Sequence, residues 1–119
     1  MKILKDITMA GKSAIAVKTF EAEPGVKEPE LQIVLSVLAG EGLVTVIDKY
    51  AIHSIVVKDT LDKLFEYFKR KSLIELSCFR DMTGLSRNVA VTLLEYFDSK
   101  GITCREGNSR RLVKKLMLV

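Results

Sequence analysis

Apolar residues recur at helical spacing in two stretches of the second half of the chain. A helix that begins at Asp59 or Thr60 would bring together one apolar row, which consists of Leu61, Leu64, Phe65 and Phe68. A helix over residues 87–99, capped by Ser86 and ended by Gly101, would bring together another, which consists of Ala90, Leu93, Leu94 and Phe97. The pattern therefore predicts two amphipathic helices around one core.

Shorter elements are expected around these helices. Residues 73–76 should be extended, and a short helix should run from a Ser77 cap to Gly84, which suits a left-handed C-terminal residue. After the longer helix we expect two strands, near residues 102–105 and 110–113, joined by a turn at Gly107-Asn108.

The first half of the chain predicts the same order of elements. We expect a helix, an extended segment, a short helix, a longer helix and a hairpin, over residues 3–9, 14–18, 19–23, 28–39 and 43–53. Turns should form at Pro24-Gly25 and Asp48-Lys49, and Pro29 suits the first turn of the longer helix because its missing N–H costs nothing there.

A shift of 59 residues aligns the two halves without a gap. Residues 15–54 fall on residues 74–113, with five identities at Ile15/Ile74, Phe20/Phe79, Gly25/Gly84, Leu35/Leu94 and Gly42/Gly101. Each half has the element order of a winged helix, in which the second and third helices form a helix-turn-helix and the hairpin is the wing. We therefore predict an α+β fold, mainly α with small β-hairpins: tandem winged-helix domains over 1–57 and 58–119, joined near residues 54–58.

The charge is unevenly distributed between the halves. The chain has 119 residues and a net charge of +4, yet residues 80–119 hold 8 Lys and Arg against 4 Asp and Glu, while residues 1–79 hold 11 of each. Five of the six arginines lie in that last stretch. Such a concentration indicates a polyanion-binding surface, although a solvated basic face without a partner is the alternative.

The candidate contacts follow from the fold, because the third helix and the wing are the elements that meet nucleic acid in this architecture. In the second half these positions carry Arg87, Asn88, Arg105, Gly107, Asn108, Arg110 and Arg111. The first half has Glu28 and Glu30 at the helix start and a single cation, Lys49, in its wing. We expect it to be a spacer or protein-contact module, with weak nucleic-acid contact through Lys49 as the alternative.

No catalytic or metal-binding pattern is evident. His53 has no nucleophile at a recognisable spacing, and Cys78 and Cys104 form no Cys-x-x-Cys motif. Gly11-Lys12-Ser13 lacks the glycine that a phosphate-binding loop needs five residues earlier. Tyr67 and Tyr96 are expected in core packing, with base stacking as the alternative. We therefore expect a protein that is not an enzyme and holds no cofactor. No apolar run could span a bilayer and no leader is evident, so we also expect it to be cytoplasmic.

Three segments of the second half carry a family resemblance. They are Phe79-Arg80-Asp81 with Gly84-Leu85-Ser86-Arg87-Asn88, then Leu93-Leu94-Glu95-Tyr96-Phe97-Asp98, then Gly101-Ile102-Thr103-Cys104-Arg105-Glu106-Gly107-Asn108-Ser109-Arg110. Together they resemble the last winged-helix module of the bacterial selenocysteine-specific translation elongation factor. Asn88, Cys104 and Asn108 stand where that family usually has lysine, arginine and aspartate.

The resemblance implies a function. The chain would be an RNA-binding fragment that recognises an mRNA hairpin, the selenocysteine insertion element, and so directs selenocysteine incorporation at UGA. Arg87, Arg105, Gly107 and Arg110 fall on motif positions of the family. Selenocysteyl-tRNA and GTP would bind only through an N-terminal portion that this chain lacks, and the ribosome is a further candidate partner. We expect a monomer with no membrane partner.

Two other functions fit the pattern. One is a tandem winged-helix DNA-binding transcription regulator, and the other is a protein-interaction scaffold whose basic end is only solvated. A regulator that reads a palindrome usually dimerises, whereas here only one half carries the basic residues, which favours the RNA hairpin.

Overall fold

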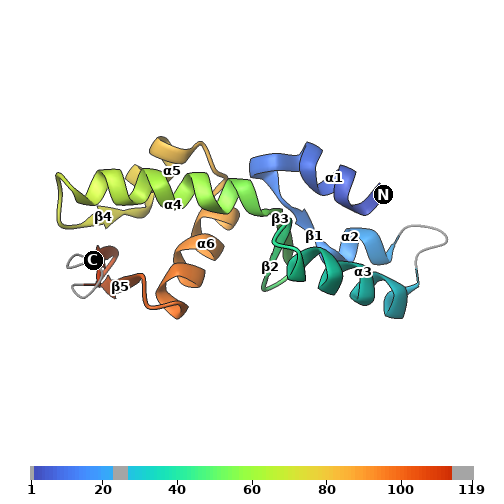
Figure 1. Ribbon diagram of the computed structural model, residues 1–119. Helices are drawn as coiled ribbons and strands as arrows, with labels where there is room; N and C mark the ends of the chain where they lie inside the picture. Colours follow the sequence, from blue (N-terminus) through green and yellow to red (C-terminus); the bar gives the residue numbers. More distant parts are fainter. Residues whose placement is uncertain (1, 23–26, 114–119) are drawn as a thin grey trace. The chain divides into compact units, whose positions relative to one another are not determined.

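The computed structural model describes residues 2–22 and 27–113, apart from the side chains of Lys2 and Glu28 (Figure 1). The chain forms two compact units, residues 1–58 and residues 59–119, with the division at 58/59. The predicted turn at Pro24-Gly25 and the cations Lys114 and Lys115 lie outside the described residues.

The first unit contains three helices, a single turn of 3-10 helix and a small sheet. In chain order these are α1 (Lys2–Ala10), η1 (Gly11–Ser13), β1 (Ile15–Ala16), α2 (Val17–Glu21), α3 (Glu28–Gly40), β2 (Val44–Ile47) and β3 (Tyr50–His53). The sheet is antiparallel in the order β1-β3-β2, with Ala51 opposite both Ile15 and Val46. The hairpin β2–β3 is thus the wing of this unit.

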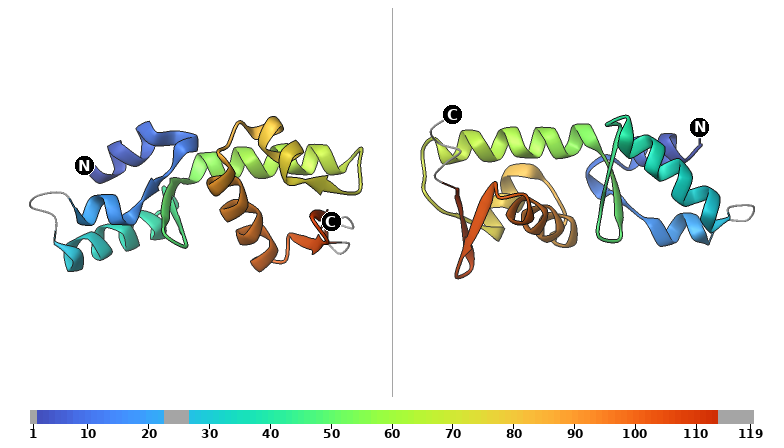
Figure 2. Two further views of the ribbon diagram at one scale, coloured as in Figure 1. Left: turned by 180° about the vertical axis from the view of Figure 1, so that it is seen from behind. Right: turned by 60° about the horizontal axis from the view of Figure 1, so that its bottom comes forward.

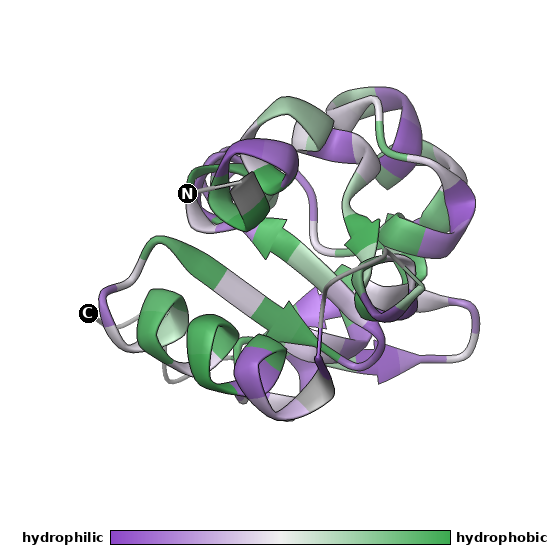
Figure 3. Ribbon diagram, turned by 90° about the vertical axis from the view of Figure 1, so that its right-hand side faces the viewer, coloured by the Kyte–Doolittle hydropathy of each residue, from purple (hydrophilic) through white to green (hydrophobic). Residues whose placement is uncertain are grey.

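The core of the first unit lies between its helices and sheet. Its buried residues are Ile7, Phe20, Leu31, Leu35, Leu38, Val44 and Ala51. Helix α3 is hydrophobic along most of its ribbon in Figure 3. A helix that buries one face needs only a single apolar stripe, so α3 has more apolar residues than its packing requires.

The second unit repeats this arrangement. Helix α4 (Ser54–Phe68) begins in the first unit and continues into the second. The further elements of the second unit are β4 (Ile74–Glu75), α5 (Leu76–Thr83), α6 (Arg87–Ser99), β5 (Thr103–Glu106) and β6 (Ser109–Leu112). The sheet is antiparallel in the order β4-β6-β5, so β6 is its central strand. The hairpin of each unit stands beside its third helix in Figure 2.

The 59-residue repeat is reproduced element by element. Four pairs of elements have both ends offset by 59 residues. The pairs are β1 with β4, β2 with β5, β3 with β6 and α3 with α6. The hydrogen bonds repeat as well: Leu43 N donates to Leu38 O in the first unit, and Ile102 N donates to Phe97 O in the second, both at 3.0 Å. The predicted fold, mainly helical with a small wing in each unit, is confirmed.

Three predicted helix starts are wrong. Helix α2 begins at Val17, inside the segment 14–18 that the sequence predicts as extended. Helix α4 begins at Ser54 rather than at Asp59 or Thr60, so the predicted join at residues 54–58 is helical. Its first turn is held by the ring of His53, whose Nδ1 accepts a hydrogen bond from Ile55 N at 3.2 Å. Helix α5 begins at Leu76, one residue before the predicted Ser77 cap, and no side chain caps it. At the start of α4, Ser54 N donates to Leu43 O at 3.0 Å, and α5 begins directly after strand β4.

Candidate nucleic-acid interface

The first part of the candidate interface is the start of α6. The Ser86 side chain accepts a hydrogen bond from Val89 N at 3.4 Å, as predicted for a capping serine. The helix is held in place by buried residues on its inner face, namely Val89, Ala90, Leu93, Leu94 and Phe97. Arg87 and Asn88 lie in the first turn and are exposed, beside backbone N–H groups that favour an anion.

The second part is the turn of the β5–β6 wing. Gly107 has a φ of 59°, a left-handed conformation that favours glycine. The Arg105 Nε donates a hydrogen bond to Gly107 O at 3.0 Å, which fixes the guanidinium against the turn. This bond uses one of the five N–H donors of arginine, so Arg105 keeps donors for a ligand. Asn108 is exposed beside it.

Arg111 is also on the wing but already has an ion-pair partner. Its Nε lies 2.7 Å from Glu106 Oε1 across the hairpin, and both side chains are partly exposed. An exposed pair of this kind contributes little to stability, so a phosphate can compete for the arginine.

Arg110 does not fit the expectation of an exposed wing cation. Its side chain is only 9% exposed, and its Nε lies 3.3 Å from Asp98 Oδ2 on α6. The low exposure and the ion pair show that this side chain faces α6 and the interior of the unit. The charge of Arg110 is evident from the sequence but its pairing is not, because strand register decides which face a residue occupies.

Asp98 and Thr103 were missed by the sequence analysis. The Thr103 hydroxyl, on β5, donates to Asp98 Oδ1 at 2.6 Å, while Arg110 occupies the other carboxylate oxygen. One half-buried carboxylate therefore joins the end of α6 to both strands of the wing. The available signal was an acid at the end of a predicted helix in an otherwise basic stretch.

The first unit has different residues at the same positions. At the offset of 59, Val46 replaces Arg105 and Asp48 replaces Gly107. Three apolar side chains on α3 and β2 are exposed there: Ile33 at 64%, Val37 at 50% and Val46 at 42%. This surface therefore lacks the wing arginine and the turn glycine of the second unit. The difference agrees with the predicted asymmetry of positive charge between the two units.

The two candidate stacking tyrosines are not free aromatic platforms. Tyr67 is half-buried and its hydroxyl donates to Leu73 O at 2.7 Å. Burial raises the pKa of Tyr67, and Cys78 and Glu75 shift this pKa in the same direction. Tyr96 is half-buried, with Lys100 Nζ 5.5 Å from its ring centroid.

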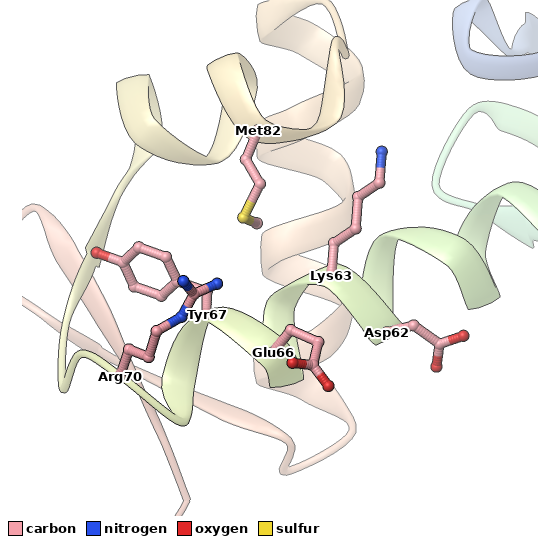
Figure 4. A pocket seen from close by; sticks show the side chains of 6 residues that line it. All are labelled: Asp62, Lys63, Glu66, Tyr67, Arg70 and Met82. Carbon is pink, nitrogen blue, oxygen red and sulfur yellow. The ribbon is translucent and has the colours of Figure 1, made fainter.

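Tyr67 also lines an open cavity of about 390 Å³ between α4 and α5. The other lining residues are Asp62, Lys63, Glu66, Arg70 and Met82. In Figure 4 the Met82 side chain points down from α5 towards Tyr67, with charged groups around the opening. The lining mixes acids and cations and includes none of the wing residues, so it adds nothing to the basic surface.

In residues 2–22 and 27–113 no group of three or more His, Cys, Asp or Glu could hold a metal ion. Within the same ranges no helix is both long and apolar enough to cross a membrane. Cys78 and Cys104 are half-buried free thiols.

Comparisons with known proteins place these features in a family. The family model described as "Elongation factor SelB, winged helix" matches residues 66–112. The chain is 27% identical over 107 residues to the selenocysteine-specific elongation factor of Desulfomicrobium baculatum and 30% identical over 111 residues to that of Escherichia coli K12. These matches cover 89% and 85% of this chain but 17% of each relative, so the chain spans about a sixth of their length.

Solved structures give the same result. A bacterial selenocysteine-specific elongation factor, EF-Sec, matches 93% of this chain and 17% of its own with a TM-score of 0.70 and 25% identity. The mRNA-binding domain of E. coli SelB, solved in complex with SECIS RNA, matches 92% of this chain and 96% of its own with a TM-score of 0.68 and 26% identity. Residues 66–112 are therefore a winged-helix module of the selenocysteine-specific elongation factor (SelB) family, as the motifs in residues 79–110 indicated, and the chain is similar along nearly its whole length to the mRNA-binding domain of E. coli SelB.

Proposed function

We propose that this chain binds an mRNA stem-loop of the SECIS type and so directs an elongation factor to the selenocysteine codon UGA. The observation that carries this proposal is the pair of exposed basic points in one unit, Arg87 at a capped helix start and Arg105 at the wing turn. The E. coli domain that this chain resembles along nearly its whole length was solved with SECIS RNA.

The chemistry of the surface suits an RNA hairpin. A-form RNA hides its base edges in a deep major groove, so specific proteins grip the backbone and reach looped or flipped bases. A helix start offers N–H donors to phosphate, and a glycine turn lets the main chain approach closely. Together Arg87 and the wing turn provide two separate holds on one backbone.

The two units have different roles in this proposal. The second unit binds the RNA, because its wing and third helix carry the exposed arginines. The first unit acts as a spacer or protein contact, because its corresponding surface carries Ile33, Val37 and Val46. We further propose that GTP, selenocysteyl-tRNA and the ribosome are contacted by other parts of a full-length factor. The proposed role needs no catalysis and no cofactor in this chain, and translation would take place in the cytoplasm.

A mobility-shift assay tests the proposal. The full chain is titrated into the SECIS RNA stem-loop, a duplex DNA of equal length and a scrambled hairpin, all at matched salt. We expect the SECIS stem-loop to bind at least tenfold more tightly than either control. Preference for the duplex would instead favour the DNA-binding regulator, and binding to none of the three would favour the scaffold.

A further inference from the structure

The strongest feature not used by the proposed binding surface is the polar network of Asp98, Thr103 and Arg110. The Asp98 carboxylate accepts Thr103 Oγ1 at 2.6 Å on one oxygen and Arg110 Nε at 3.3 Å on the other. As whole residues Thr103 is 2% and Arg110 7% exposed, whereas the Asp98 side chain is 25% exposed, so both partners of the carboxylate are shielded from water. Such hydrogen bonds hold their partners more rigidly than exposed ones do.

The three residues join separate parts of the second unit. Asp98 lies in the last turn of α6, Thr103 opens β5, and Arg110 lies on the central strand β6. In the ladder, Arg105 lies opposite Arg110, so the wing arginine sits on the strand pair that the network holds. The network therefore ties the position of Arg105 to the helix that begins at Arg87.

The first unit shows that this fold does not need the network. At the offset of 59 residues the same positions hold Ala39, Val44 and Ala51. Val44 is 2% exposed and Ala51 is 0% exposed, so apolar packing suffices to seat the wing there. At these three positions, polar groups that cost desolvation thus occur only in the unit with the basic surface. Such groups can serve to fix a specific geometry even where they add little stability.

We propose that Asp98, Thr103 and Arg110 are positioning residues, which lock the wing to α6 so that Arg105 and Arg87 meet the RNA backbone at a set separation. This inference rests on the proposed function for its ligand. The competing account is that Arg110 contacts RNA directly and that Asp98 merely holds it back.

The sign of one effect separates the two accounts. Asp98→Asn removes a negative charge, which by electrostatics alone strengthens binding to a polyanion and would also release Arg110. If the network positions the wing, the same substitution weakens binding. Asparagine has only one side-chain oxygen, so its NH2 group would face either the Thr103 hydroxyl or Arg110 Nε, and one of the two hydrogen bonds would be lost. In a variant whose melting curve shows an intact fold, weaker binding by the more positive chain is expected from positioning and not from electrostatics alone.

Thr103→Val provides a variant that does not leave a buried charge unpaired. Valine is the residue of the first unit at this position, and the substitution changes no charge. The matched control is Thr45→Val, because Thr45 is on the first unit's wing and its hydroxyl lies 2.9 Å from Ser54 Oγ. We expect Thr103→Val to weaken binding of the SECIS RNA stem-loop about three- to thirtyfold, and the control to leave it unchanged.

The experiment measures two quantities on the full chain. The first is the Kd for the SECIS RNA stem-loop at fixed salt, for wild type, Asp98→Asn, Thr103→Val and Thr45→Val. The second is amide hydrogen exchange of residues 103–112, with residues 44–53 of the same molecule as internal reference. We expect faster exchange of the β5–β6 amides in the Asp98 and Thr103 variants, without a change in the reference hairpin.

The outcomes distinguish this inference from the proposed function. Stronger RNA binding by Asp98→Asn, or unchanged binding and exchange in Thr103→Val, overturns positioning while the RNA function stands. If the wild type binds no stem-loop, the proposed function fails, and unchanged exchange in the variants then overturns the lock as well. If the wild type binds no stem-loop but the β5–β6 amides exchange faster in the variants, the network still holds the wing in place, and its ligand is not this RNA.

Discussion

Asp98 Oδ2 and Arg110 Nε lie 3.3 Å apart and join the last turn of α6 to the central strand of its sheet. The arginine is 9% exposed and its partner 25%, so the pair lies at the edge of the core. Removing one partner would leave a charge largely buried without compensation, which is costly. We therefore predict that Arg110 belongs to the framework of the wing, and that the exposed Arg87 and Arg105 and the partly exposed Arg111 contact the RNA.

Arg87→Ala and Arg105→Ala should each weaken stem-loop binding by about 1–3 kcal/mol. Arg87 is held by the capped start of α6, and Arg105 by its hydrogen bond to Gly107 O, so each loses little side-chain entropy on binding. The matched control is Arg70→Ala, an exposed arginine after the end of α4, which should change affinity by well under ~1 kcal/mol. Titrations monitored by fluorescence anisotropy, after thermal melts show intact folding, would measure this. Equal losses in all three variants would indicate nonspecific attraction.

The salt dependence of RNA binding should reflect three exposed arginines rather than four. Because Arg110 is buried against Asp98, the expected slope of log K against log salt is about −2 to −3. The slope is obtained from Kd values at several KCl concentrations. A slope near zero would contradict the electrostatic part of the interface.

Gly107→Val should destabilise the wing by about 1–2 kcal/mol, because a β-branched residue is strained at a φ of 59°. Gly107→Asn is the control, since asparagine tolerates this region and the equivalent Asp48 adopts a φ of 54° in the first unit. Thermal unfolding followed by circular dichroism compares the two. A valine variant as stable as the asparagine variant would show that the turn relaxes to another conformation.

Tyr67 should make the second unit less stable in alkali. Its pKa in the folded chain is raised above the ordinary 10.0, mainly by burial, so above that pH the unfolded chain loses the phenolic proton first. The free energy of unfolding should therefore fall as pH rises through this range. Tyr67→Phe removes the titrating group and should give a flatter curve from urea titrations between pH 8 and 11. Identical curves would mean that Tyr67 does not titrate differently on folding.

A fragment that begins at His53 should retain most of the RNA affinity, whereas one that begins at Lys58 should fold less well. The shorter fragment loses the first turn of α4 and the His53 Nδ1 that accepts Ile55 N. Melting curves establish folding, and stem-loop titrations then compare the folded fragment with the full chain. Loss of nearly all binding in a folded fragment 53–119 would assign an RNA contact to the first unit.

Much of this protein follows from its sequence because its elements are encoded locally. Apolar spacing defines α3 and α6, Ser86 caps α6, and Gly84 and Gly101, with φ of 74° each, end α5 and follow α6. The repeat at 59 residues carried the element order from one unit to the other, and the charge asymmetry indicated which unit meets a polyanion.

Tertiary structure decided what a linear pattern cannot express. The folded sheet brings the Arg110 guanidinium against Asp98, and this burial and pairing are why we propose a framework role for a residue that the sequence predicts as an RNA contact. The sequence around either residue does not indicate this ion pair. The pair forms only when α6 packs against β6, which brings together two residues that are 12 positions apart in the chain. The start of α4 was hidden for the same reason: Ser54 N donates to Leu43 O, a contact that exists only after the wing has folded back. Sequence determines local preference, and the packed fold determines which charges remain available to a ligand.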